Sequence, residues 1–194
     1  MKRIDVRFDD TMICHLRAMI GKTFLKYKCD PFIVTSSAFG IVGIVTEHGS
    51  FAITNTIHVL DHFGADEDVA VLELCPLPET EMRSMLKGVM MTDHAIGRQI
   101  KEIRVINENQ RLFEQGKQIY DVCLTRGLVF VLADGYEVAF EKQTWFSEMM
   151  SIHEGHNLID KFVPASEFCK DWDSRYRAEC ERQIVVLRWI YQGG

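Results

Sequence analysis

Two apolar runs flank the dipeptide Asp134-Gly135, and together they form the clearest structural signal in the chain. Asp-Gly suits the positive-φ positions of a two-residue turn, so residues 126–140 predict a β-hairpin. In that register Val131 lies opposite Val138, and every second residue of each strand shares their side of the sheet. That side is wholly apolar, which indicates a surface that faces a core.

The other side of this hairpin is apolar along one strand, whereas its partner strand carries Glu137 and Glu141. One apolar face and one partly charged face are typical of an antiparallel hairpin that covers a core. We therefore expect Val131, Val138 and Phe140 to be buried. Glu137 is expected to be exposed or at a rim.

The rest of the chain shows more strand patterns than helix patterns. Residues 3–8 alternate strictly between polar and apolar, as a strand with one wet face does. Asp9 or Asp10 can cap a following helix and Gly21 can end it, with apolar residues at helical spacing between them. We predict an α+β fold, mainly antiparallel β-sheet with a few short helices, in a single domain of residues 1–194. Further strands are expected near 23–29, 39–55, 69–75, 103–105 and 183–191, and short helices at 79–87 and after Ser166.

A shift of 87 residues places residues 40–55 on residues 127–142 without a gap. Gly40, Val42 and Ala52 then meet identical residues, and apolar positions meet apolar positions. Duplication of a β-hairpin module would divide the chain into similar halves, about 1–100 and 101–194. Two unrelated buried hairpins would share the same pattern, so three identities leave both interpretations open.

Composition narrows the class of partner. The formal net charge is −6, and no run of Lys and Arg occurs, which argues against a nucleic-acid partner. The six cysteines are scattered without a CxxC pair, so we expect free thiols and a cytoplasmic location. The charged start lacks the pattern of a signal peptide, and no apolar run approaches the roughly 18 residues that cross a bilayer. No membrane association is expected.

Two histidine pairs could carry metal chemistry. His58 and His62 are four residues apart, a spacing that on a helix places both imidazoles on one side, with Asp61 between them. Asp66 and Glu67 could add carboxylates, which defines one alternative function, a divalent-metal-dependent hydrolase. The segment HVLDH lacks the glutamate of the zincin motif, so a polar surface segment is the simpler interpretation. The second pair, His153 and His156, brackets a glycine and indicates a turn.

The segment 141–148 is the best candidate for recognition. Glu141 and Glu148 flank the aromatic pair Trp145 and Phe146, and aromatic residues dominate interface energetics. A cover over one end of the core would explain the two rings equally well. No nucleophile elbow, phosphate loop or cofactor motif occurs. We therefore predict a non-enzymatic module that binds a protein partner or itself, without a cofactor, and rank a nucleic-acid-associated regulator as the weakest alternative.

Self-association is the more specific form of this prediction. A flat, sheet-rich chain has four large aromatic side chains to accommodate, namely Trp145, Phe146, Trp189 and Tyr191. An apolar patch that they leave exposed would suit a symmetric dimer contact.

Overall fold

The computed structural model describes residues 1–170 and 172–189, so Tyr191 lies outside the described residues. Strands make up 60% of the structure and helices 12%, and nearly all strand pairs are antiparallel. The fold is therefore mainly β rather than α+β. The two short helices expected after the first are 3-10 turns. No helix of the described part is long and apolar enough to span a membrane.

Eleven strands, one α-helix and three 3-10 turns make up the described part of the chain. Their bounds are β1 (Lys2–Val6), α1 (Asp10–Met19), β2 (Thr23–Cys29), β3 (Ser37–Phe39), β4 (Ile41–Thr46), β5 (Gly49–His62), β6 (Ala65–Pro76), η1 (Glu79–Glu81), β7 (Thr92–Glu114), β8 (Lys117–Leu132), β9 (Glu137–Lys142), β10 (Met149–Gly155), η2 (Leu158–Lys161), η3 (Ala165–Cys169) and β11 (Tyr176–Arg188).

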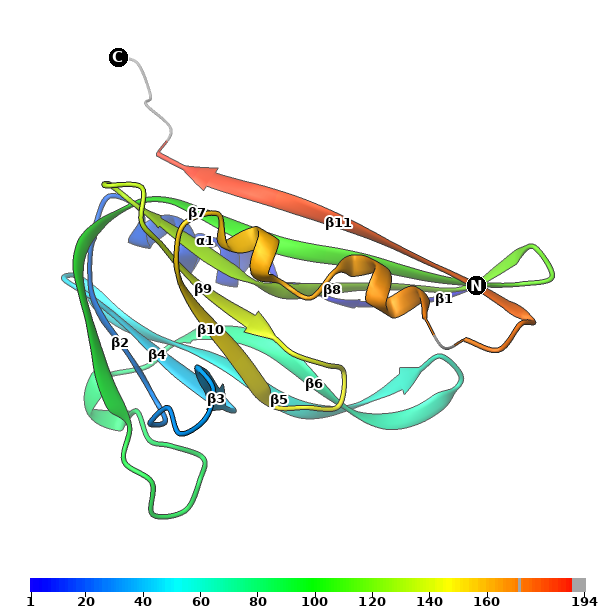
Figure 1. Cartoon of the computed structure of the whole chain (residues 1–194), viewed down its shortest axis with the longest axis horizontal. Coiled ribbons are helices and arrows are strands. Elements are labelled where there is room, and N and C mark those ends of the chain that lie inside the picture. The colour runs from blue at the N-terminus through cyan, green and yellow to red at the C-terminus, as the bar shows by residue number, and fades with distance from the viewer. Residues whose placement is uncertain (171, 190–194) are drawn as a thin grey trace.

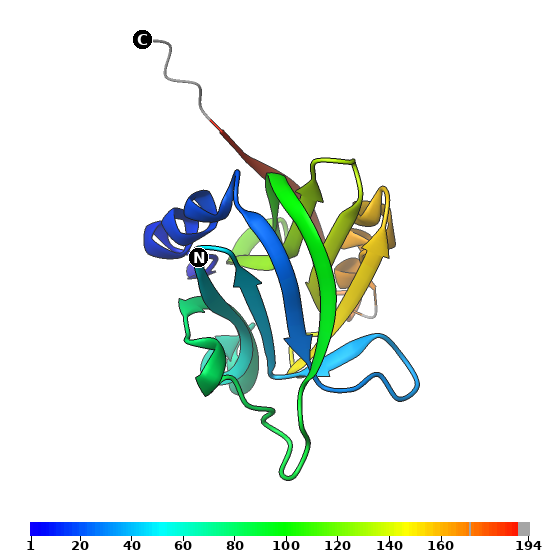
Figure 2. The same cartoon turned by 90° about the vertical axis from the view of Figure 1, so that its left-hand side faces the viewer.

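The sheet closes on itself. Its path runs β3-β10-β9-β8-β7-β2-β4-β5-β6, and β3 is separated from β4 by Gly40 alone. Because β3 pairs with β10 while β4 pairs with β2, the strands curve around a common interior, which Figure 2 shows end-on. Asn55 lies near the junction of β3 and β4, where β5 stops pairing with β4 and β10 stops pairing with β3. It is fully buried, and its amide donates to the carbonyl of Ser147 at 2.9 Å, so it links the two edges at the closure.

Beyond the closed part, β7 and β8 continue as a long ribbon that carries an extra strand on each side. β1 pairs with β8 in parallel over Lys2–Val6, and β11 pairs with β7 along its whole length. In Figure 1 β11 is the outermost strand of this ribbon. The strand expected near 103–105 is the centre of β7, which extends much further in both directions and includes residues 93–97 and 107–109.

The main core lies inside the closed sheet. Phe24, Tyr27, Phe130 and Phe140 are fully buried there, and the rings of Tyr27 and Phe140 meet edge to face. The helix α1 packs against β6, β7 and β11. Its cap is Asp9, whose side chain accepts from the Met12 amide at 2.8 Å, as the sequence predicted.

The β8–β9 hairpin forms, but its register differs by one residue from the prediction. Val131 pairs with Glu137, and Phe130 with Val138, because the loop has three residues and Gly135 at its end adopts a φ of +85°. Val138 and Phe140 are buried, as expected. Val131 lies half-buried on the outer face, and Glu137 is only 5% exposed, so the prediction of an exposed Glu137 is wrong.

The two hairpins of the proposed repeat differ in this same respect. In the β4–β5 hairpin Val42 pairs with Ile53, but the corresponding Val129 pairs with Ala139 rather than Phe140. The shift arises because the first loop has two residues and the second has three. The internal duplication stays a prediction.

Candidate functional site

The four residues of the predicted recognition segment do not share one surface. Phe146 is 56% exposed, and Trp145 and Glu148 are half-buried, but Glu141 is only 2% exposed. Glu141 is buried because β9 directs it to the outer face of the sheet, beneath residues 156–170, which we call the cover segment. Of the two carboxylates that flank the aromatic pair, only Glu148 is therefore partly accessible.

Arg126 is the partner of Glu141, and a β-bulge aims it there. On β7 consecutive residues Ile106 and Asn107 pair with Gly127 and Thr125, so Arg126 is the extra residue of β8. Its side chain is 8% exposed. The guanidinium donates from Nε to Glu141 Oε1 at 3.3 Å and from Nη2 to the Gln143 carbonyl at 2.7 Å.

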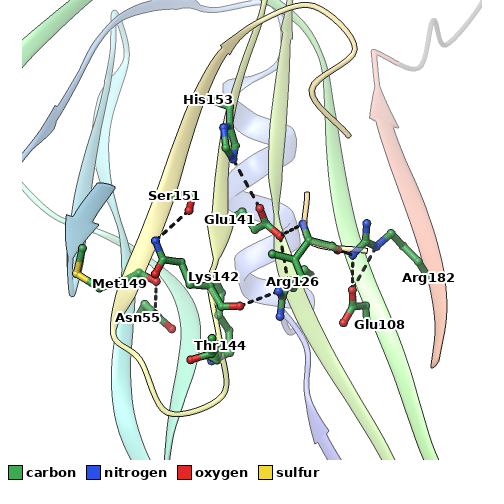
Figure 3. Close-up of polar contacts among 12 residues, drawn as sticks. Asn55, Glu108, Arg126, Glu141, Lys142, Thr144, Met149, Ser151, His153 and Arg182 are labelled. Atoms are coloured by element: carbon green, nitrogen blue, oxygen red, sulfur yellow. Dashed lines mark hydrogen bonds and ion pairs between the residues drawn. The ribbon is translucent and has the colours of Figure 1, made fainter. Parts of the chain in front are cut away.

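Glu141 also holds the cover segment in place. The same oxygen accepts from the Val163 amide at 2.7 Å, and its other oxygen lies 3.6 Å from Nε2 of His153 (Figure 3). Arg182 of β11 donates to the buried Glu108 on β7 at 2.5 Å and to the Val163 carbonyl. Two ion pairs from different strands therefore meet at Val163, and each buried carboxylate has a charged partner.

Gly127 lets the cover segment approach the sheet. A Cβ atom there would lie 2.3 Å from the Phe140 carbonyl oxygen and 2.9 Å from the ring of Phe162. The Phe162 ring instead packs with Val129 and Ala139 in a second apolar cluster on the outer face. This cluster explains why both faces of the hairpin are buried.

A cavity of about 440 Å³ lies between this polar network and the cover segment. Glu108, Gln110 and Arg126 line it from the sheet, Trp145 and Phe168 are among its aromatic walls, and most of its surface is apolar. Trp145 is fixed because its indole Nε1 donates to Gln110 Oε1 at 3.0 Å. The position of this cavity was not predicted from the sequence.

Lys142 lies on the opposite face of β9 from Glu141, and it is 2% exposed. Its ammonium donates to the carbonyls of Thr144 and Trp145, and no carboxylate of the described residues lies within 4 Å of it. Burial and, to a smaller extent, the charge of Arg126 lower the pKa of Lys142 to about 7. These two hydrogen bonds hold the β9–β10 loop against β9.

The candidate metal ligands are kept apart. His58 and His62 lie on the strand β5, where residues four apart are separated by about 13 Å along the chain. His58 approaches Glu73 at 3.7 Å, Asp61 binds Lys2, and His62 packs among the rings of Phe63, Trp145 and Phe146. Burial lowers the pKa of His62. No group of three or more acidic, histidine or cysteine side chains in the described ranges is arranged to hold a metal ion.

His153 and His156 also diverge. His153 faces Glu141, whereas His156 Nδ1 lies 2.9 Å from the Gly135 carbonyl oxygen at the tip of the β8–β9 hairpin. All six cysteines are free thiols.

The outer edge of β11 is the second candidate site. Among the described residues β11 pairs only with β7, and it does so over all of its 13 residues without a bulge. Its centre, residues 183–187, carries no charge. Ile184 and Val186 are 44% and 43% exposed, whereas Leu187 points into the core and is fully buried.

Comparisons with known proteins identify no relative. No protein-family model matches the chain, and neither a curated protein nor a solved structure is significantly similar to it.

Proposed function

We propose that the protein is a non-enzymatic association module that pairs with a second copy of itself through the free edge of β11. The observation that carries this proposal is a long, regular edge strand with an uncharged centre and two exposed β-branched side chains. Such an edge presents a row of unpaired backbone N–H and C=O groups, which favours pairing with another strand.

Several features that protect natural edges against such pairing are missing from β11. It contains no proline and no bulge within its pairing to β7, and it is far longer than a typical protected edge strand. β11 carries five charged residues, and the two that flank its uncharged centre, Arg182 and Arg188, are already paired with Glu108 and Glu102 of the same chain. They therefore repel a second copy less than free arginines would.

A symmetric antiparallel contact centred on Val185 fits these positions. In that register Ile184 of one copy lies opposite Val186 of the other, and the reverse pair follows from the twofold symmetry. Both exposed side chains lie on the same side of the sheet as the buried Ile106, so the contact would extend the outer apolar cluster across the two copies. A cytoplasmic location, where the six thiols stay reduced, is part of this proposal.

The test is sedimentation or light scattering of the purified protein from low micromolar to millimolar concentration. We expect the mass to rise from one chain to two. Ile184→Lys combined with Val186→Lys should keep the protein at one chain, because opposed lysines repel and neither side chain supports the monomer core.

The chain offers a matched control. Ile57 and Val59 on β5 have the same residue types and spacing and are 40% and 70% exposed. Ile57→Lys combined with Val59→Lys should leave association unchanged. A wild-type protein that stays monomeric throughout, or a control that dissociates as completely as the β11 variant, would refute the proposal.

A further inference from the structure

The cavity beneath the cover segment contains one cationic group that the protein does not fully use. Arg126 has five N–H donors, of which one on Nε and one on Nη2 are bound to Glu141 and Gln143. No acceptor among the described residues receives a hydrogen bond from Nη1. Arg126 is one of the residues that line the cavity, and its Nη1 donors are the ones left for a ligand bound there.

The guanidinium is held in place before any ligand arrives. Glu141 and the Gln143 carbonyl fix two of its nitrogens, and the bulge at Arg126 fixes the backbone behind it. The distance of 3.3 Å from Nε to Glu141 is long for a charged pair, and Glu141 shares that oxygen with the Val163 amide. Both N–H donors of Nη1 therefore remain available to an anion, beside the second N–H of Nη2.

The remaining walls restrict which anion can enter. Trp145, Phe168, Val163 and Pro164 provide apolar surface, and the carboxylates of Glu108 and Glu167 are each paired with a cation of the same chain. A multiply charged group such as a phosphate dianion would meet only one cationic group with free donors, Arg126. A singly charged group attached to a flat apolar body fits both the one arginine and the aromatic walls.

We propose that this cavity binds a small organic carboxylate that carries a flat apolar group, with its carboxylate on Arg126 and its apolar part against Trp145 and Phe168. The site is separate from the β11 edge, so its test does not depend on self-association. The volume of about 440 Å³ lies in the range of small-molecule sites.

Benzoate is a suitable probe, with benzamide as its uncharged match of the same shape. Binding is measured by the change in amide chemical shifts during titration of the full chain. We expect benzoate to shift the resonances of residues around Arg126 and Trp145, and benzamide to bind about tenfold more weakly or not at all.

Two variants test the site without removing a buried charge. Arg126→Lys keeps the positive charge beside Glu141 but lacks the planar fork, so it should weaken benzoate binding about tenfold. Ala165→Trp fills the cavity from η3 and leaves every ion pair in place, so it should abolish binding. Circular dichroism and thermal unfolding establish that each variant is folded.

Three results would each contradict a different part of the proposal. Equal binding of benzoate and benzamide would overturn the assignment of Arg126 as the anion contact. Benzoate binding that survives Ala165→Trp in a folded protein would place the ligand elsewhere. Absence of any benzoate-induced shift up to the solubility limit would refute the proposed class of ligand.

Discussion

Replacing Lys142 with methionine should change how the stability of the protein depends on pH. The side chain is 2% exposed, and burial lowers its pKa from the ordinary 10.5 to about 7. Between those two values the unfolded chain holds a proton on Lys142 that the folded protein lacks. Folding stability therefore rises with pH across this window, and the contribution is level above pH 10.5 and below about pH 7.

The size of the effect follows from these two pKa values. Linkage gives an increase of about 2 kcal/mol in the free energy of unfolding between pH 7 and pH 9 for this group alone. Other groups titrate in the same range, since burial also raises the pKa values of Cys75 and Cys123. The quantity to measure is therefore the difference between wild type and Lys142→Met, because the shared groups cancel in it.

Urea unfolding of both proteins at pH 7, 8 and 9 measures this difference. Wild type should gain stability relative to Lys142→Met at each step. Lys26→Met is the control, because its ion pairs with Asp93 and Glu79 raise the pKa of Lys26 above 10.5. The stabilisation from these ion pairs is fully present below pH 10.5. The difference in stability between wild type and Lys26→Met should therefore stay level from pH 7 to pH 9. A level difference for Lys142 as well would refute the reasoning.

Other substitutions test the packing by urea unfolding. Phe140→Ala should cost about 3–5 kcal/mol, because it opens a cavity in the inner core; a loss below about 1 kcal/mol would contradict that placement. Glu137→Ala should cost about 1–3 kcal/mol, since it leaves the Leu158 amide without its 2.7 Å acceptor, while Glu137→Gln should cost less. Gly127→Ala should destabilise by about 1–3 kcal/mol or more through its clash with the Phe140 carbonyl, and a neutral effect would show that the strands can separate there. Thiol titration of the unreduced, denatured protein should find six reactive groups, and four would reveal a disulfide.

The sequence predicted local features better than their arrangement. The first helix and its Asp9 cap, the hairpin around Asp134-Gly135 and the burial of Phe140 follow from spacing and turn chemistry, which act over a few residues. The hairpin register was wrong because Asp-Gly is compatible with loops of two and three residues. Only the covering of the outer face decides between them, and that depends on Phe162, far along the chain.

The buried ion pairs could not be found from the sequence in this way. Arg126, Glu108 and Arg182 lie on different strands, and each alone resembles an ordinary surface charge. The one local signal was Thr125-Arg126-Gly127, where polar residues and a glycine interrupt an otherwise apolar run, as a bulge often does. The spacing of His58 and His62 did not indicate a metal site, because side chains four residues apart lie together on a helix but are separated on the strand β5.

The closure of the sheet has a consequence for the order in which the chain folds. Ala38 of β3 pairs with Met150 of β10, 112 residues away in the sequence, whereas β5 with β6 and β7 with β8 are joined by short loops. Loop-closure entropy opposes distant contacts until nearer ones have shortened the effective loop. We expect the hairpins to form first and the β3–β10 seam last, with Asn55 engaging only then. Asn55→Ala should accordingly speed unfolding far more than it slows refolding in stopped-flow experiments, and equal changes in both rates would place the seam in the folding nucleus.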